Sequence, residues 1–459
     1  MDRDEQHKTK RKVTLPQLLM ENASRYSDAK TAIREKAYGI WQKYTWAEYC
    51  RYMRITAAGF ASLNLRRGEN ICLIVHNHPE WLFSELAAHA LGATTLNLFT
   101  SSIADELAFS IKRINSPVVV VQDQEQVDKL LEVKEKLPQT KKVIYIDPTG
   151  MTSYKDDPWL ISYAELLEAG EKLIKEHPDF IEEEINKGRP DDIAIMIQTS
   201  GTTGVPKLAM LSHRNLTTMA RQWVEETKIK PEENWLSMSP PAWIVDQMWG
   251  MGVALQSAMV MNFPETAETV LEDFRDIGPS MIITASRFWE DMASRIRVKI
   301  SDASWLKKKL FYWGESVGKS VVEKQSHKQP VPLSLRALYK VMSVAVYRPL
   351  LDRLGCAHFH SAFTGGHPIS PDVILFFRAI GLNLKQCYGL TESGGIFQIQ
   401  PDNEVKLETV GKPLPLTEVK IADDQEVLVK SEANFSGYHN DYQSTQGAFE
   451  DGWLKTGDA

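Results

Sequence analysis

The chain has 459 residues, of which 43% are hydrophobic and 25% are charged, and its formal net charge is −7. This is ordinary globular composition, and the length predicts two or three packed subdomains. Lys and Arg number 53 against 60 Asp and Glu, so the charge does not favour a nucleic-acid partner. The 4 cysteines show no metal-binding spacing, and we interpret them as reduced thiols of a cytoplasmic protein.

The hydropathy pattern argues against a membrane span and against a secretory signal. No run of about 18 apolar residues occurs anywhere in the sequence. Residues 1–12 are strongly charged and lack an apolar core. We expect them to form a disordered start.

Residues 13–190 are expected to form a first α/β subdomain that ends in a connector. Apolar spacing predicts helices at 14–26, 46–65, 79–91 and 103–114. Apolar runs predict a hairpin at 32–46 and strands at 70–75, 93–98, 118–121 and 143–146. Strands that alternate with helices at this spacing are typical of a mostly parallel, doubly wound sheet. The polar, helical residues 151–190 are expected to form the connector.

Two histidines in the first subdomain invite a metal-site interpretation. His76 and His78 flank Asn77, but no third ligand lies near them in the sequence. Because a protein metal site normally uses three or four ligands, we interpret both as ordinary loop residues.

A second α/β subdomain is expected over residues 191–400, and it opens with the most informative stretch of the chain. An apolar strand at 192–198 runs into Thr199-Ser-Gly-Thr-Thr-Gly-Val-Pro-Lys207, and a short apolar segment and a helix from about residue 215 follow. Glycines allow close approach to an anion, and backbone N–H groups, hydroxyls and one lysine suit a polyphosphate. The spacing differs from that of a Walker A loop. The candidate phosphate-binding residues are Thr199, Ser200, Gly201, Thr202, Thr203, Gly204 and Lys207.

Further α/β elements follow the loop. We expect a helix-like apolar run at 248–260, a strand at 277–284 and a helix at 286–300. A strand at 359–363, a helix from Ser370 to residue 380 and a strand at 383–386 complete this subdomain. Residues 401–459, in which 406–430 alternate apolar and polar positions, are expected to form a small antiparallel β-subdomain.

The segment 301–355 is basic and rich in aromatic residues. Two interpretations remain open for it. It forms either a solvated helical hairpin or a surface that contacts anionic lipid headgroups as a peripheral membrane attachment.

Four separated segments, in order, resemble the adenylate-forming superfamily, which includes acyl-CoA synthetases and luciferases. They are the loop at 199–207, Thr364-Gly-Gly-His-Pro368, Tyr388-Gly-Leu-Thr-Glu392 and Thr456-Gly-Asp458. The resemblance implies two doubly wound α/β subdomains and a small β-subdomain. It also implies that ATP and Mg²⁺ bind at the strand ends.

The same resemblance implies a role for each matching residue. Lys207, Thr391 and Glu392 would be catalytic, with Glu392 and Thr199 holding Mg²⁺. Tyr388 would stack on adenine and Asp458 would bind the ribose. The implied adenine and ribose residues are Gly365, Gly366, His367, Gln386, Cys387, Tyr388, Gly389 and Asp458.

The acyl substrate is indicated by two further features. Residues 240–247 and the long insert before Gly365 look most like those of long-chain acyl-CoA synthetases, which implies an acyl pocket at Trp243 and Gln247 and CoA as co-substrate. Another adenylating ligase (fatty acyl-AMP or aryl-CoA) and a module that binds ATP or acyl-AMP without turnover remain alternatives. Members of the superfamily continue into a hinge and a domain of about a hundred residues. We therefore expect this sequence to represent the large N-terminal portion, without the C-terminal lid.

Overall fold

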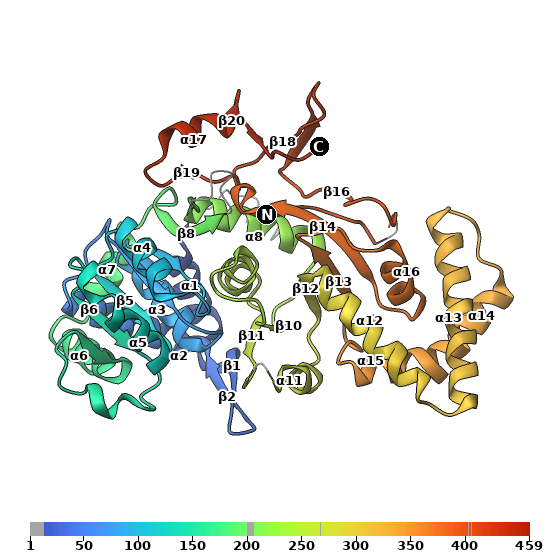
Figure 1. Cartoon of the computed structure of the whole chain (residues 1–459), viewed down its shortest axis with the longest axis horizontal. Helices are drawn as coiled ribbons and strands as arrows, with labels where there is room; N and C mark the ends of the chain where they lie inside the picture. Colours follow the sequence, from blue (N-terminus) through green and yellow to red (C-terminus); the bar gives the residue numbers. More distant parts are fainter. Residues whose placement is uncertain (1–12, 200–205, 267, 403, 405) are drawn as a thin grey trace, which may run out of the picture.

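The computed structural model describes residues 13–199, 206–266, 268–402, 404 and 406–459. In these ranges the strands form four sheets, and helices pack around the larger ones (Figure 1). The architecture is mixed α/β with parallel sheets, as the sequence predicts.

The largest sheet has the strand order β19-β9-β8-β4-β3-β5-β6-β7. All neighbours from β8 to β7 are parallel, whereas β9 and β19 are antiparallel additions at one edge. The strands are β3 (Asn70–Ile74), β4 (Thr94–Asn97), β5 (Val118–Val121), β6 (Lys142–Tyr145), β7 (Leu160–Ser162), β8 (Ile193–Thr199), β9 (Lys207–Ser212) and β19 (Gly437–Tyr438).

Alternating side chains of this sheet enter two separate cores. Ile71 and Leu73 of β3 pack into one core with α2 (Trp46–Ser62) and α3 (Pro79–Ala90). Cys72 and Ile74 pack into the other with α4 (Ala104–Arg113). The helix α5 (Gln124–Glu132) also covers this second face. The expected doubly wound arrangement is therefore present.

Residues 151–190 are more than the connector expected from their polarity. They contain β7, α6 (Tyr163–Glu176) and α7 (Phe180–Lys187), and β7 forms the edge of the large sheet. A Cβ on Gly170 of α6 would lie 2.0 Å from the carbonyl oxygen of Ile55 in α2. This close approach between α6 and α2 requires glycine, and the exposed face of α6 explains the polar composition.

The predicted hairpin at 32–46 forms, and it joins a mixed sheet of order β10-β11-β1-β2. Both this sheet and the large sheet contain strands from before and after residue 190. Neither sheet therefore follows the expected boundary between the first and second subdomains. The strands are β1 (Thr31–Ala37), β2 (Ile40–Thr45), β10 (Asn234–Leu236) and β11 (Val260–Phe263). The N-terminal helix α1 (Leu15–Tyr26) begins with a capping box between Thr14 and Gln17.

The third sheet has the order β12-β13-β14-β15-β16, and its first three strands are parallel. The apolar run at 248–260 forms a π-helical segment, η4 (Gln247–Val253), a short α10 (Ala254–Ser257) and then β11, and not one helix. The strands of the third sheet are β12 (Met281–Ala285), β13 (Ser361–Gly365), β14 (Leu384–Leu390), β15 (Gly395–Ile399) and β16 (Lys412–Pro413). The remaining helices of this region are α8 (His213–Thr227), α9 (Ile244–Asp246), α11 (Val270–Ile277), α12 (Ser286–Ser301) and α16 (Pro371–Ala379).

The basic segment is helical, as expected, and stands at one end of the molecule (Figure 1). It contains α13 (Trp305–Ser326), α14 (Leu333–Met342), the π-helical η5 (Ser343–Tyr347) and α15 (Arg348–Arg353). A Cβ on Gly318 would lie 2.0 Å from the carbonyl oxygen of Ala379, so α13 packs tightly on α16. Among the described residues, no helix combines the length and apolarity that a membrane span needs.

The last part of the chain forms the expected small antiparallel sheet, of order β17-β18-β21-β20. Its elements are β17 (Glu418–Ile421), β18 (Val427–Lys430), α17 (Tyr442–Gly447), β20 (Phe449–Glu450) and β21 (Trp453–Lys455). Single 3₁₀ turns complete the described structure at η1 (Ser27–Ala29), η2 (Lys134–Lys136), η3 (Met151–Tyr154) and η6 (Thr391–Ser393).

Candidate functional site

A cavity of about 500 Å³ lies where the ends of β8, β12 and β13 meet the second half of β14. Ligands of open α/β sheets bind at the carboxyl ends of such strands. Residues of the small C-terminal sheet, Lys455 and Thr456, contribute to its wall. Of the expected site residues, those that line this cavity are Thr199, Trp243, Gly365, Gly366, Cys387, Gly389, Thr391 and Glu392.

Two glycines shape one wall of the cavity. A Cβ on Gly365 would lie 2.8 Å from the Cys387 Sγ, so β13 and β14 approach too closely for any larger residue. Gly366 has φ +84°, a backbone conformation that side chains disfavour. Burial raises the pKa of the Cys387 thiol to about 12, and its Sγ lies 3.2 Å from the Thr364 carbonyl oxygen. This cysteine is therefore a packing residue of the wall and not a nucleophile.

Glu392 reaches the cavity from the short turn η6. Its carboxylate is bonded to Tyr438, a residue that was not expected from the sequence. The Tyr438 hydroxyl donates a 2.8 Å hydrogen bond to the Glu392 Oε1. The Lys207 Nζ lies 4.9 Å from the centre of the same Tyr438 ring. Burial, and then Glu392, raise the pKa of Tyr438, so its hydroxyl remains a donor at neutral pH. Tyr438 thus joins a cation of β9 to a carboxylate that follows β14.

Tyr388 and Asp458 are brought together, although 70 residues separate them in the sequence. The Tyr388 hydroxyl donates a 2.6 Å hydrogen bond to the Asp458 Oδ2. Burial, and then this carboxylate, raise the pKa of Tyr388. The ring packs edge-to-face against Phe397, at 5.0 Å between ring centres. Neither residue lines the cavity, but their chain neighbours Cys387, Gly389 and Thr456 do, so the pair lies next to it.

Several expected site residues do not line the cavity. The Gln386 amide donates to the backbone carbonyl oxygens of Leu407 and Thr409, which leaves it little capacity for a ligand. The Gln247 side chain is buried behind the wall, and His367 is exposed beside Gly366. The expected residues Ser200, Gly201, Thr202, Thr203 and Gly204 lie outside the described part of the chain.

Sequence reasoning also missed a second cation of the site. Lys455 lines the cavity at the end of β21, and its Nζ lies 3.6 Å from the Glu426 Oε2. It directly precedes Thr456 in the sequence. This position next to the Thr-Gly-Asp segment could have indicated Lys455 as a site residue. Tyr438 offered no such signal, because its position depends on the pairing of β19 with β9.

The wall that carries Trp243 rests on two buried carboxylates. Asp246, at the end of α9, accepts hydrogen bonds from the Asn77 Nδ2 at 2.8 Å, the Ser237 Oγ at 2.9 Å and the Trp235 Nε1 at 3.3 Å. Burial raises the pKa of Asp246 to about 7, although these donors lower it.

The second buried carboxylate, Glu85 of α3, lies on the other side of Gln247. It accepts hydrogen bonds from the Gln247 Nε2 at 3.1 Å and the Thr95 Oγ1 at 2.6 Å. Burial raises the pKa of Glu85 to about 7 as well. Asp246 and Gln247 therefore anchor the beginning of η4, and with it the residues that face the cavity.

Comparison with known proteins identifies the family. Residues 19–439 match the family described as AMP-binding enzyme. The chain belongs to this family. It is 27% identical to a long-chain-fatty-acid–CoA ligase, ACSBG2, of Xenopus laevis, and the match covers 97% of this chain and 61% of that one. It is 28% identical to the long-chain-fatty-acid–CoA ligase FadD15 of Mycobacterium tuberculosis, over 92% of this chain and 68% of that one. The chain thus spans less than two thirds of the length of the first relative.

Solved structures agree on the fold. The anthranilate CoA ligase AuaEII in complex with anthranoyl-AMP superposes with a TM-score of 0.69 at 16% identity, over 97% of this chain and 74% of that one. The inhibitor-bound N-terminal domain of FACL13 from Mycobacterium tuberculosis gives 0.67 at 18% identity, over 97% and 96%. Both comparisons support the architecture of an adenylate-forming enzyme.

The buried Asp246 predicts a measurable pH dependence of stability. Its pKa in the folded chain is about 7, whereas that of an unfolded Asp is about 4. The stability associated with its protonation is therefore fully present below about pH 4 and lost as the pH rises to about 7. The variant Asp246→Asn has no carboxyl group to ionise, so it does not lose this stability. Its Tm minus that of the unchanged chain should therefore increase as the pH rises from about 4 to about 7.

The matched control is Asp291→Asn, which changes an exposed aspartate of α12. Thermal unfolding at several pH values between 4 and 7 compares the three proteins. A Tm difference between Asp246→Asn and the unchanged chain that is the same at every pH would contradict the assignment.

Proposed function

We propose that this chain activates a long-chain fatty acid with ATP, forming an acyl adenylate and pyrophosphate, as the large portion of an enzyme that then transfers the acyl group to CoA. The observation that supports this most is the meeting of segments from four distant parts of the sequence. Thr199, Gly365, Glu392 and Thr456 line one cavity at the strand ends. The family match and the names of the relatives agree with it.

In the first step a carboxylate oxygen attacks the α-phosphorus of ATP. A P–O bond forms, the bond from the α-phosphorus to its bridging oxygen breaks, and pyrophosphate leaves with the electron pair. Because two anions must approach each other, their repulsion has to be screened by positive charge. Lys207 would contact the β- and γ-phosphates, and Thr391 would donate to the α-phosphate.

The cavity offers suitable groups for Mg²⁺. Glu392 has its Oε1 bonded to Tyr438, and no hydrogen bond from the described residues reaches its Oε2. Thr199 supplies a hydroxyl oxygen in the same cavity. Hard oxygen ligands of this kind suit Mg²⁺, which when bound neutralises charge on the phosphates. Tyr438 would orient the Glu392 carboxylate.

The nucleoside would lie along the wall formed by Gly365 and Gly366. We propose that Tyr388 stacks on the adenine and that Asp458 accepts hydrogen bonds from the ribose hydroxyls. The Tyr388–Asp458 hydrogen bond orients both groups before the nucleotide binds. Trp243, which lies beside Gly366, and Met248 would then limit the acyl chain.

The proposed reaction is tested by identifying products with mass spectrometry, with and without CoA, for a series of carboxylic acids. Acyl adenylate from long-chain acids supports the proposal, and acyl-CoA that forms only when CoA is present supports the second step. Preference for aryl acids would favour an aryl-CoA ligase. Nucleotide binding without any product would indicate a binding module.

The first prediction from this proposal concerns Lys207. Its replacement in Lys207→Ala should weaken ATP binding roughly 10- to 100-fold, because one charged contact to phosphate contributes about 1.5–3 kcal/mol. The control is Lys420→Ala, since Lys420 also lies over an aromatic ring, that of Trp453, but belongs to β17 of the small C-terminal sheet. Calorimetry with ATP measures both. Equal ATP affinity in the two variants would exclude this role for Lys207.

The second prediction concerns Glu392. The variant Glu392→Gln replaces the carboxylate with a neutral amide. It should raise the Mg²⁺ concentration needed for half-maximal ATP binding by about tenfold or more, since a charged metal ligand is lost. The exposed Glu432, changed to Gln, serves as the control. An unchanged Mg²⁺ requirement in Glu392→Gln would show that Glu392 does not hold the ion.

We also propose that the α13–α14 region contacts anionic lipid. Trp305 and Trp313 are 73% and 51% exposed, and with Lys309 they share one face of α13 at helical spacing. Interfacial aromatic residues and lysines are typical of peripheral membrane attachment.

This membrane contact predicts salt-sensitive binding to vesicles that contain phosphatidylserine, with little binding to neutral vesicles. Binding should fall severalfold in a Trp305→Ala, Trp313→Ala double variant and remain unchanged in Tyr442→Ala, which removes an exposed aromatic side chain of α17. Cosedimentation measures all three proteins. Binding that ignores lipid charge and salt would leave only the solvated-hairpin interpretation.

A further inference from the structure

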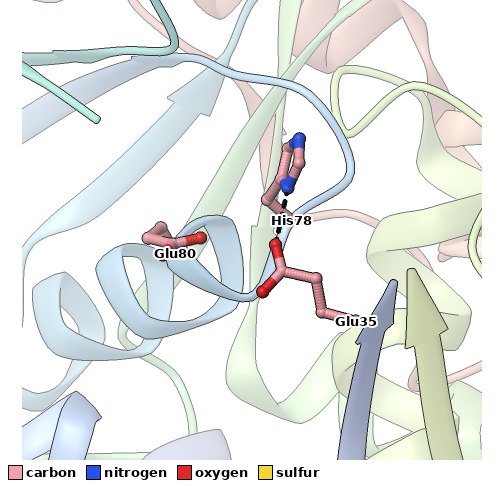
Figure 2. Close-up of side chains that lie close together, drawn as sticks. All are labelled: Glu35, His78 and Glu80. Atoms are coloured by element: carbon pink, nitrogen blue, oxygen red, sulfur yellow. Dashed lines mark hydrogen bonds and ion pairs between the residues drawn. The ribbon is translucent and has the colours of Figure 1, made fainter. Parts of the chain in front are cut away.

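A second group of ligand-type side chains lies apart from the nucleotide cavity, where β1 meets the beginning of α3 (Figure 2). Glu35 comes from β1, His78 precedes α3 and Glu80 belongs to its first turn. The His78 Nδ1 lies 2.9 Å from the Glu35 Oε1. One ligand atom from each of the three side chains lies within 4.8 Å of the other two. No carboxylate that could join His78 was expected from the sequence, and the fold supplies two.

The negative charge of this group is not balanced by nearby basic residues. In the described ranges, no Lys or Arg nitrogen lies within 4.0 Å of a Glu35 or Glu80 carboxylate oxygen. The adjacent Lys36 instead pairs with Asp273 and Asp276, at 2.7 Å each. Two carboxyl groups therefore share one imidazole, without a basic residue as ion-pair partner in the described ranges. A divalent cation would neutralise this charge directly.

Strand pairing holds Glu35 in place. Glu35 lies between partners on both sides, in register with Gln42 of β2 and Phe263 of β11. The Tyr44 hydroxyl donates to the Glu35 Oε2 at 3.4 Å, which orients the carboxylate. The side chains of Glu35 and His78 are only 16% and 28% exposed. A ligand set that is placed in advance needs little rearrangement to bind an ion.

We propose that Glu35, His78 and Glu80 bind a divalent transition-metal ion, for which Zn²⁺ is the best match. An imidazole with two carboxylates suits Zn²⁺ better than Mg²⁺ or Ca²⁺, which prefer ligand sets made only of oxygen. Metal–ligand bonds of about 2.0–2.2 Å would draw the three atoms closer through side-chain rotation. The His78 Nδ1 would lose its proton on binding, and water would complete the coordination.

Such an ion would connect two parts of the fold. Glu35 belongs to the mixed sheet β10-β11-β1-β2, whereas α3 packs on the large sheet. None of the three residues lines the nucleotide cavity, so the site would stabilise the contact between the sheets without entering the proposed reaction. Because metal binds the folded chain preferentially, it should raise the Tm.

The test titrates the metal-free full chain, without nucleotide, with Co²⁺ as a spectroscopic probe for a zinc site. We expect a visible d–d absorption that saturates at one Co²⁺ per chain and disappears when Zn²⁺ is added, together with a higher Tm in Zn²⁺. Glu80→Gln and His78→Ala should each weaken Co²⁺ binding about 100-fold, since even loss of a residue that supports a metal ligand costs about 10–100-fold.

The matched control is His360→Gln. The His360 Nε2 lies 3.0 Å from the Glu233 Oε2, and in the described ranges this pair has no third ligand of its kind. Its loss should leave Co²⁺ affinity unchanged. Absence of a saturable Co²⁺ absorption in the unchanged chain would overturn the proposal and leave Glu35 and His78 as an ordinary ion pair. Equal Co²⁺ affinity in the unchanged chain and in both cluster variants would overturn it too.

Discussion

The contacts of one side chain, Tyr438, connect the three parts of the candidate site. Its strand β19 pairs with β9 of the large sheet, its ring lies beneath the Lys207 ammonium, and its hydroxyl bonds to Glu392. Without this contact, a lysine and a glutamate on different sheets would have no common partner among the described residues. Tyr438 and Glu392 line the cavity, and Lys207 lies against the tyrosine ring without forming an ion pair with Glu392 among the described residues.

Two buried carboxylates stabilise the wall of the cavity that carries Trp243. Asp246 and Glu85 are fully enclosed, and each accepts several hydrogen bonds from neutral donors. Burial disfavours the ionised form more than these donors favour it, so both groups titrate near neutral pH. They fix the residues at the end of α9 and the beginning of η4; Trp243, which precedes α9, and Met248 of η4 both line the cavity. A shape-selective wall of this kind is consistent with an acyl-binding role.

The sequence predicted most of the secondary structure because the apolar spacing and the caps are local signals. The helix α2, for example, begins at Trp46 as expected from its apolar spacing, and a capping box of Thr45 and Glu48 precedes it. It also indicated Thr199, Gly365 and Glu392, which follow recognisable segments and line the cavity. Gln386 and Gln247 were misplaced because a sequence does not reveal which amides are already bonded to backbone carbonyls. Tyr438 and the Glu35–His78–Glu80 group were missed because they depend on contacts between strands far apart in the chain.

The central claim is that one nucleotide site is formed at the meeting point of these sheets. A crystal structure of the chain with a non-hydrolysable acyl-adenylate analogue tests it most directly. The account predicts the adenine against Tyr388 and the Gly365–Gly366 wall, the ribose hydroxyls on Asp458, and the acyl chain along Trp243. Analogue density elsewhere on the molecule, or a nucleotide that does not contact Tyr388 or Asp458, would contradict it.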